Sequence, residues 1–447
     1  MESRSRYRSL FLTAFVLLWL APAPGAAQVP ATCGTGAPDS WIAACDAIID
    51  NPAESTQNRV RALKFRGLAR YRAGDIDRAA ADFTAATGLA PDDAEAWSNL
   101  GMMRQTRGDL DGAIANYDKA IALDPKSWVG HINRGNALRL KRDAAGAIAE
   151  YDIALGLKPD LGAALRGRGL ARQLQGNLPA AVADATAALR IDPRDGEALL
   201  NRGNAFRLLG NADKALADYE EATVAAPDLA GAWLNRGALL MEKGNIERAI
   251  ESFDKTIALN PRSIEAYNNR GASRSQNGDF ARAAADLDTA VRLGPNYEGA
   301  YGNRGFVRLA LGDFAGADAD FSALAARNPD DPYRVLWRHL ARMRAGTADD
   351  GFAREAAALG SGPWPGPLLA LYAGTLDREK VMAMGPEVEP AQRAERQCEI
   401  VFYVGEYALV KNDPAAATPL LREAAASCPV GSLERAGALG ELKRLQP

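Results

Sequence analysis

Apolar and small residues recur along the middle of this chain with a constant step. Glycine returns at Gly67, Gly101, Gly135, Gly169, Gly203, Gly237, Gly271 and Gly305, and a proline follows each of them by 24 residues. If that glycine is position 8 and the proline position 32, large apolar or aromatic residues dominate positions 4 and 24, and alanine fills position 20. This spacing, kept without one insertion, predicts eight copies of a helix pair over residues 60–331. The glycine at position 8 is expected to press against the alanine at position 20.

The residues at these positions resemble the tetratricopeptide repeat (TPR), a helix–turn–helix unit of about 34 residues. The resemblance covers 272 of the 447 residues. It implies an all-α fold, in which antiparallel helix pairs stack into a right-handed superhelical solenoid. It also implies that the partners are other proteins or extended peptides, bound in a concave groove.

Less regular copies are predicted at the ends of the array. A glycine and a proline keep the 24-residue offset within 398–431, so we expect a ninth repeat there and a capping helix over 432–447. Residues 332–397 are expected to form a degenerate helical insertion between the eighth and ninth repeats. Residues 28–59 are expected to form an N-terminal cap that contains half a repeat.

The C-terminal third also resembles the C-terminal part of periplasmic TPR lipoproteins, through the strings DPYRVLW, FYVGEYALVKND and ERAGALGELKRL. Those proteins act as adaptors that bring a tail-specific protease to cell-wall hydrolases. This chain departs from them because no lipid-bearing cysteine ends its N-terminal apolar run and because it has many more repeats. The resemblance implies a scaffold for cell-envelope enzymes.

Residues 1–27 have the pattern of an export signal. Three arginines precede an apolar run from Leu10 to Leu20, and the small-residue string APAPGAA follows. A run of eleven residues is short for a membrane span, which needs roughly 20. We expect cleavage after Ala27 and a soluble mature protein, periplasmic or secreted, without a membrane span. An uncleaved anchor is the alternative.

The charge of the chain argues against one class of partner. Removing residues 1–27, which carry a net charge of +2, changes the formal net charge from −3 to −5. Sequence-independent binding of nucleic acid needs a basic footprint. We therefore predict no nucleic-acid partner.

Four cysteines fall as two pairs at opposite ends of the chain, and none lies within the eight repeats. We predict two local disulfides, Cys33–Cys45 and Cys398–Cys428, which would close both ends of the array. Cys398 and Cys428 would occupy positions 1 and 31 of the ninth repeat, which meet at the open end of a helix hairpin. An even number of paired cysteines is typical of an oxidising compartment.

Arginine at position 7 varies together with an acid at position 23, which lies level with it across a hairpin that turns near position 15. We predict intra-repeat ion pairs, because the arginine fork suits a carboxylate. The pairs are Arg66–Asp82, Arg134–Glu150, Arg168–Asp184, Arg202–Asp218, Arg270–Asp286 and Arg304–Asp320. Leu100 faces Asn116 instead, and Arg236 faces Ser252. The alternative is a solvated basic stripe that binds a ligand.

Asparagine at position 6 is predicted to face the groove, since it lies 200° from position 4 at 100° per residue. The predicted ladder is Asn99, Asn133, Asn201, Asn235, Asn269 and Asn303. An amide offers both donors and an acceptor, so it can hold a peptide backbone without reading its sequence. The alternative is that asparagine only follows the family pattern, in which it is common at this position.

Neighbouring positions 5, 9 and 12 of repeats 3 to 5 extend the predicted peptide-binding groove with Asn136, Asn204, Arg139, Arg166 and Arg207. These side chains favour an extended polypeptide or an acidic group as the ligand. The two-carboxylate clamp of chaperone-binding TPR domains is absent. Lys64 is followed by Leu68, Val129 and Asn133 where the clamp requires other residues.

Nothing in the sequence predicts catalysis, a cofactor or a metal site. The chain has two histidines: His131 occupies position 4, a core position, and His339 lies alone after the array. No phosphate-binding loop, metal-ligand cluster or nucleophile elbow occurs.

The favoured function is therefore a periplasmic protein-interaction scaffold or adaptor. The alternative is a glycan-associated accessory protein for assembly or export of an envelope polysaccharide. A glycan groove needs exposed aromatic platforms, and only Tyr71 and Phe306 are candidates. No motif specifies the partner or the oligomeric state.

Overall fold

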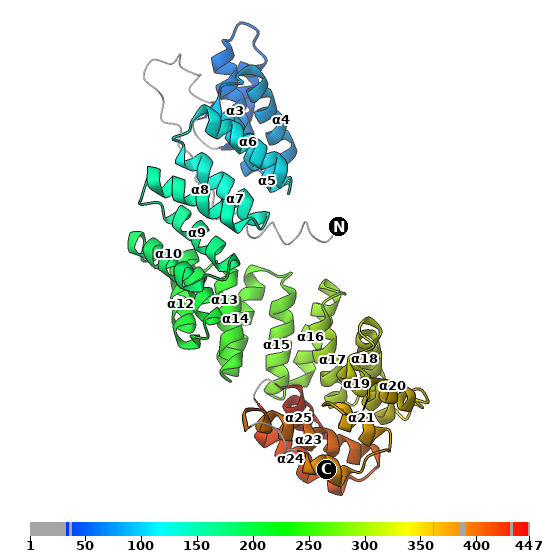
Figure 1. Ribbon diagram of the computed structural model, residues 1–447. Helices are drawn as coiled ribbons and strands as arrows, with labels where there is room; N and C mark the ends of the chain where they lie inside the picture. Colours follow the sequence, from blue (N-terminus) through cyan, green and yellow to red (C-terminus); the bar gives the residue numbers. More distant parts are fainter. Residues whose placement is uncertain (1–32, 35–37, 361, 385–389, 430–431, 446–447) are drawn as a thin grey trace. The chain divides into compact units, whose positions relative to one another are not determined.

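The computed structural model describes residues 33–34, 38–360, 362–384, 390–429 and 432–445 (Figure 1). The expected export signal at 1–27 lies outside the described residues. The described residues form helices α2 to α25, joined by turns and short loops, in two compact units that are divided between Ala226 and Pro227. Among the described helices, none is both long and apolar enough to cross a membrane.

The first unit begins with α2 (Pro38–Ile49) and continues with five antiparallel helix pairs. These are α3 (Thr56–Arg72) with α4 (Ile76–Leu89), α5 (Ala94–Thr106) with α6 (Leu110–Leu123), α7 (Trp128–Leu140) with α8 (Ala144–Leu157), α9 (Gly162–Leu174) with α10 (Leu178–Ile191), and α11 (Gly196–Leu208) with α12 (Ala212–Ala225). Each pair also packs against the next one, so the apolar faces are covered by stacking.

The second unit contains three further regular pairs. These are α13 (Ala230–Glu242) with α14 (Ile246–Leu259), α15 (Ile264–Gln276) with α16 (Phe280–Leu293), and α17 (Glu298–Leu311) with α18 (Phe314–Arg327). They are followed by α19 (Pro332–Arg344), the short helices α20 (Phe352–Leu359), α21 (Gly366–Tyr372) and α22 (Arg378–Ala383), then α23 (Pro390–Val410), α24 (Pro414–Ser427) and α25 (Leu433–Arg444). Helix α23 begins eight residues before Cys398, where the ninth repeat is expected to start.

A residue with left-handed backbone at position 15 turns the chain in every one of the eight repeats. Seven repeats have glycine there, with φ between 73° and 85°, and the third has Arg142 with φ 66°. The next residue is aspartate or asparagine, and in six repeats its side chain caps the second helix. Asp109, for example, accepts a hydrogen bond from the N–H of Gly112 at 2.9 Å. The turn thus has a local cause that is written in each repeat.

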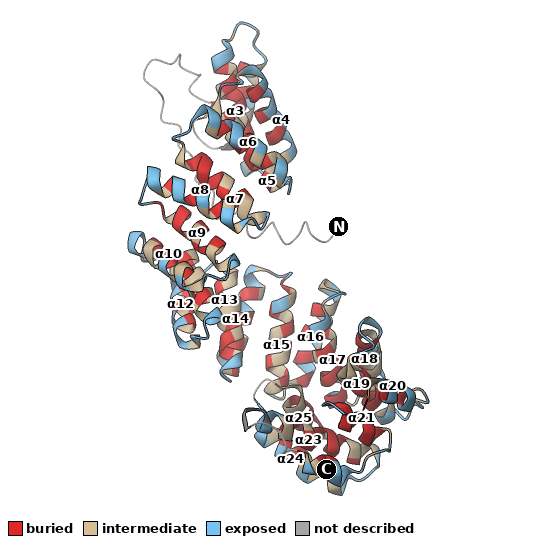
Figure 2. Cartoon of the chain, viewed as in Figure 1, coloured by how far each residue is buried: buried red, intermediate tan, exposed pale blue. Residues whose placement is uncertain are grey.

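The core of each repeat lies between its two helices, where the buried residues gather (Figure 2). The glycine at position 8 was expected to press against the alanine at position 20. In six of the eight repeats its main neighbour is instead an aromatic ring at position 24, whereas Gly169 lies nearest to Ala181 at position 20 and Gly271 nearest to Leu287. A Cβ on Gly203 would lie 2.7 Å from the Tyr219 ring, and one on Gly305 would lie 2.5 Å from the Phe321 ring. The alanine at position 20 approaches the glycine with its backbone: the carbonyl oxygen of Ala215 lies 3.3 Å from that Cβ on Gly203. In these six repeats glycine therefore makes room for a ring.

Both predicted disulfides are confirmed. The Cα atoms of Cys33 and Cys45 are 5.0 Å apart, and those of Cys398 and Cys428 are 4.9 Å apart. The second bridge joins α23 to the end of α24, so it closes the open end of that hairpin. Among the described residues there is no free cysteine.

Candidate functional site

The position-6 asparagines divide into bonded and open side chains. The amide nitrogen of Asn133 donates to the Ser98 hydroxyl at 3.4 Å, and that of Asn303 donates to the Asn268 side-chain oxygen at 2.9 Å. In both cases the acceptor is at position 5 of the preceding repeat, so these amides join neighbouring repeats. Asn269 in turn accepts from Asn268 at 3.0 Å.

Two asparagines of the predicted ladder have side chains without a hydrogen bond to another described residue. Asn99 on α5 and Asn201 on α11 are partly exposed, and no hydrogen bond joins their side chains to another described residue. Asn235 on α13 is partly exposed as well. The amides that can reach a ligand in the first unit are therefore those of Asn99 and Asn201.

The two asparagines at position 9 were expected to be open to a ligand, but both are hydrogen-bonded within the protein. The side-chain oxygen of Asn136 accepts from the Tyr151 hydroxyl at 2.7 Å, and that of Asn204 accepts from Tyr219 at 2.8 Å. Each asparagine satisfies a tyrosine hydroxyl that the repeat core buries. Burial raises the pKa of Tyr151 to about 12, although the nearby Arg139 acts in the opposite direction.

Arg166 is likewise engaged within the protein. Its guanidinium pairs with Asp195, the last residue of its own repeat and the N-cap of α11, and lies 3.4 Å from Glu197 of the following repeat. Lys64 does the same at position 5 of the first repeat, 2.8 Å from Asp93 and 2.7 Å from Glu95. Position 5 therefore holds an ion pair to the first helix of the next repeat in these two repeats. Arg207, at position 12 on α11, is exposed but also has a contact within the protein.

The same helices carry an apolar feature that was missed in the sequence. Leu174 at the end of α9 and Leu208 at the end of α11 are 50% and 60% exposed. Both occupy position 13, which lies two helical turns beyond position 6 and therefore on the same side of the helix. The signal was available, since leucine stands at position 13 in three successive repeats, beginning with Leu140.

The structure brings together the two members of all six predicted ion pairs. The closest N···O distances are 2.6 Å for Arg66–Asp82, Arg168–Asp184, Arg270–Asp286 and Arg304–Asp320 and 2.7 Å for Arg202–Asp218, and Arg134 pairs with Glu150 as well. Arg236, which faces no acid at position 23, donates to the Ser252 hydroxyl at 2.8 Å. These arginines are partly buried on the hairpins, so they do not form a free basic stripe.

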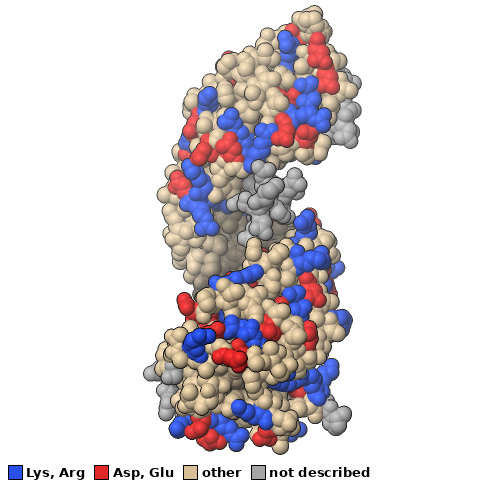
Figure 3. Space-filling view, turned by 90° about the vertical axis from the view of Figure 1, so that its right-hand side faces the viewer, with Lys and Arg blue, Asp and Glu red and all other residues tan. Residues whose placement is uncertain are grey.

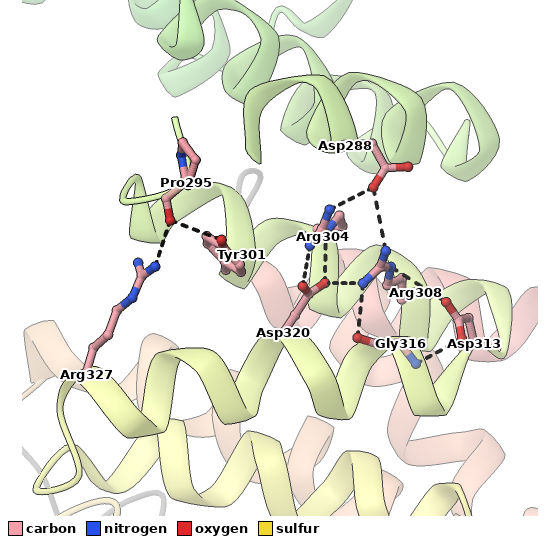
Figure 4. Close-up of polar contacts among 9 residues, drawn as sticks. All are labelled: Asp288, Pro295, Tyr301, Arg304, Arg308, Asp313, Gly316, Asp320 and Arg327. Atoms are coloured by element: carbon pink, nitrogen blue, oxygen red, sulfur yellow. Dashed lines mark hydrogen bonds and ion pairs between the residues drawn. The ribbon is translucent and has the colours of Figure 1, made fainter. Parts of the chain in front are cut away.

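Most of these arginines also reach the preceding repeat, a contact that the sequence pattern had not suggested. Arg304 lies 2.8 Å from Asp288, which precedes it in the sequence by the same interval at which Asp320 follows it (Figure 4). The same contact joins Arg134 to Asp118, Arg168 to Asp152 and Arg270 to Asp254. In the sequence this contact is marked by an acid at position 25 of the preceding repeat. The first repeat has Thr84 at that position, and the second repeat correspondingly has Leu100 in place of the position-7 arginine.

A second arginine, at position 11, strengthens four of these clusters. Arg308 lies 2.8 Å from Asp320 and donates to the carbonyl oxygen of Gly316 at 3.1 Å (Figure 4). Arg70, Arg172 and Arg274 contact the corresponding aspartates at 2.7 to 2.8 Å. Each of these aspartates is buried between two guanidinium groups.

The position-4 side chains have a polar role in addition to packing. Trp97, Trp233 and Tyr301 donate to the carbonyl oxygens of Pro91, Pro227 and Pro295 at 2.9 to 3.0 Å. His131 replaces them as expected, since it is buried, with Nδ1 2.8 Å from Glu150 and Nε2 3.4 Å from the carbonyl oxygen of Pro125.

The second unit differs from the first on the helix face that was expected to line the groove. Phe306, expected as an exposed aromatic platform, is only 2% exposed. Its ring lies against those of Phe321, Trp337 and Phe402, because the C-terminal helices cover it. The expectation for Phe306 was therefore wrong, and the aromatic candidates reduce to the partly buried Tyr71.

A cavity of about 430 Å³ lies within the second unit, where α13 faces the disulfide-closed end of α23. Its lining includes Glu242, Glu395, Glu399 and Glu434. Burial raises the pKa of both Glu399 and Glu434. Among the described residues, no group of three or more histidine, cysteine, aspartate or glutamate side chains could hold a metal ion.

The described surface has no single-sign patch on the face shown in Figure 3, where lysine and arginine side chains alternate with aspartate and glutamate. Such a mixture gives no continuous basic track for a nucleic-acid backbone.

Comparison with solved structures finds TPR proteins. YrrB, described as a TPR protein with an unusual peptide-binding site, is 23% identical over 41% of this chain and 95% of its own, with a TM-score of 0.34. A tetratricopeptide repeat protein from Parabacteroides merdae is 22% identical over 55% and 97%, with a TM-score of 0.44. PilF from Pseudomonas aeruginosa is 18% identical over 46% and 94%, with a TM-score of 0.43.

No curated protein matches the sequence. The model of the tetratricopeptide repeat family matches residues 66–127, 104–162, 166–230 and 231–302, which together make up more than half of the chain. That family consists of protein-interaction scaffolds that are usually non-catalytic. From its repeat period, its helix pairs and this match, the chain belongs to the tetratricopeptide repeat family.

Proposed function

We propose that this protein is an exported scaffold that holds an extended segment of a partner protein against the first helices of repeats 2 to 5. The observation that carries the proposal is the set of side chains left open on one side of these helices. The amides of Asn99 and Asn201 bond to no other described side chain or backbone group, and Leu174 and Leu208 are half or more exposed. An exposed leucine two turns from an open amide offers an apolar contact beside a backbone hydrogen bond.

The charge on the same helices favours an acidic flank on the partner. Arg139 is partly exposed on α7. Arg166 is excluded from this role because it is paired with Asp195. The ligand class is therefore an extended peptide with spaced apolar residues and an acidic group.

Export to the periplasm is part of the proposal. Two disulfides close the ends of the chain, and disulfides persist in oxidising compartments. The export-signal pattern of residues 1–27 and the resemblance of the C-terminal third to periplasmic lipoprotein adaptors point the same way. Cell-envelope enzymes are the partners that this resemblance favours.

The glycan alternative lacks a supporting observation, because Phe306 is buried. The test is affinity capture from an envelope extract of the host, comparing the wild-type protein with Asn99→Ala/Asn201→Ala. We expect the double variant to lose its partner by about tenfold or more, which corresponds to about 1.4 kcal/mol. The matched control is Asn133→Ala, at the same repeat position but already bonded to Ser98. Equal recovery of the partner by all three proteins would show that the amides of Asn99 and Asn201 do not contribute to partner binding.

A further inference from the structure

The C-terminal helix α25 does more than cap the last repeat. It packs against α24, as a capping helix should, and also against α17, the first helix of the eighth repeat. Leu439 of α25 lies on an apolar cluster from α16 and α17 that includes Phe280 and Val307. Figure 1 shows α25 between the α15–α17 side and the C-terminal helices.

The contact with α17 depends on glycine. A Cβ on Gly440 would lie 2.2 Å from the Cβ of Ala310 and 2.7 Å from its Cα. A Cβ on Gly437 would lie 2.8 Å from the Phe402 ring and 3.8 Å from Phe306. Gly440 thus lets the backbone of α25 approach that of α17 closely, and Gly437, three residues earlier, makes room for the Phe402 ring of α23.

The surface beneath α25 corresponds to the groove side of the other repeats. Ala310 stands at position 13 and Phe306 at position 9 of the eighth repeat, where the fifth repeat has Leu208 and Asn204. Position 13 is covered by α25 in the eighth repeat, whereas Leu208 is 60% exposed. The second unit therefore fills with its own helix a surface that the first unit leaves open.

The apolar part of this docking is small. The buried residues of α25 are Ala436, Gly437, Ala438, Gly440 and Glu441. Its three leucines are only partly buried. Because the hydrophobic contribution scales with the apolar area removed from water, alanine and glycine contribute little of it.

Charged contacts supply the specificity instead. Glu441, 1% exposed, lies 3.0 Å from Arg344 and also pairs with Arg444. Arg344 lies 2.6 Å from Glu406 on α23, and Arg444 donates to the carbonyl oxygen of Leu309 at 3.3 Å. Buried ion pairs add little net stability, but removing one partner is costly because it leaves the other charge buried and uncompensated. These ion pairs therefore select a helix with an acid at the position of Glu441, but they add little to the free energy that holds the helix in place.

We propose that the groove face of the eighth repeat is a binding site for a partner helix carrying two small residues three positions apart followed by an acid, and that α25 is its built-in, displaceable occupant. This inference rests on the proposed function, since it assigns a second, self-occupied section to the same groove. A partner helix of that pattern would replace α25 on Ala310 and Phe306.

The test uses the full chain with Gly440→Leu and a fluorescent peptide of residues 432–445. In the variant the new side chain collides with the α17 backbone, so α25 must leave. A free helix of this length is marginal in water, and amide exchange over residues 433–444 should become fast. We expect the peptide to bind the variant at least tenfold more tightly than the wild-type chain. A peptide carrying Gly437→Leu and Gly440→Leu should bind neither protein.

The control is Lys443→Leu, which places the same side chain at an exposed position of α25 and should leave exchange and binding as in the wild type. If Gly440→Leu also speeds exchange in α23 and α24, the smaller Gly440→Ala replaces it, with partial release expected. Protection of residues 433–444 that persists in both variants would overturn the proposal. So would a released α25 whose peptide fails to bind. Neither result depends on Asn99 or Asn201, so the proposed function is tested separately.

Discussion

Arg304 donates from Nε and Nη2 to the two carboxylate oxygens of Asp320, at 3.0 and 2.6 Å. The same guanidinium reaches Asp288 of the preceding repeat, and Asp320 is contacted in addition by Arg308 (Figure 4). One arginine therefore ties the two helices of its own hairpin together and ties that hairpin to its neighbour. In an array where each repeat contacts only adjacent repeats, such a contact acts on the nearest-neighbour coupling.

The first prediction concerns this cluster. Asp320→Ala removes the acceptor of two guanidinium groups. Because Asp320 is only 2% exposed, we expect the free energy of unfolding to fall by about 1–3 kcal/mol. Chemical denaturation combined with amide exchange in α17 and α18 measures it. Lys141→Ala, which breaks an exposed pair with Asp111, is the control and should change stability by less than about 0.5 kcal/mol.

The second prediction concerns the repeat glycine. Gly203→Ala gains helix propensity of about 1 kcal/mol but places a Cβ 2.7 Å from the Tyr219 ring, so we expect net destabilisation of about 1–2 kcal/mol. Gly156→Ala on α8 has open space around the new Cβ and should instead stabilise the protein by up to about 1 kcal/mol. Thermal unfolding of both variants compares them. A shift of the same sign and size in both variants would show that the ring does not limit position 8.

The third prediction concerns pH. Burial, with the nearby charge of Glu441, raises the pKa of Glu406 from 4.5 to about 8, although Arg344 and Arg444 act in the opposite direction. A pKa raised on folding means that the folded state holds a proton that the unfolded state has lost, so this stabilisation is full below pH 4.5 and disappears as pH rises through about 8. Glu406→Gln should remove that dependence. The free energy of unfolding of the wild type should therefore fall relative to that of the variant between pH 5 and 9, and a constant difference would contradict the prediction.

The fourth prediction concerns the C-terminal disulfide. The Cys398–Cys428 bridge spans a sequence separation of 30 residues, so its removal should cost about 3–4 kcal/mol of unfolded-state entropy. Cys398→Ser/Cys428→Ser should speed amide exchange in α23 and α24 more than in α5 to α12. Repeating the measurement on both proteins under reducing conditions provides the check, because the amide exchange rates of the wild type should then approach those of the variant. An unchanged exchange pattern would show that packing alone closes this hairpin.

The repeat architecture was predictable because its causes are local and written eight times. Each turn has its left-handed residue at position 15, most second helices have their cap, and six of the position-7 arginines have their acid at position 23. The inter-repeat partner of Arg304 was equally regular in the sequence, but its detection required comparing position 25 of one repeat with position 7 of the next.

Other features have no periodic signature. The contact of Gly440 with Ala310 joins residues far apart in the chain, and it is this packing, with α23, that buries Phe306. Asn136 illustrates a different limit. Its place on the helix was predictable, but the buried Tyr151 hydroxyl that it satisfies is a property of the packed hairpin, so position alone indicated an open side chain.

In the proposed scaffold a partner segment lies along the first helices of repeats 2 to 5. A photoreactive amino acid placed at Leu208 can detect this segment, with the same group at the exposed Glu221 on α12 as the control. After irradiation in envelope extract of the host, we expect a protein adduct from position 208 that is lost in Asn99→Ala/Asn201→Ala, and no such adduct from position 221. An adduct from position 221 with none from position 208 would contradict it.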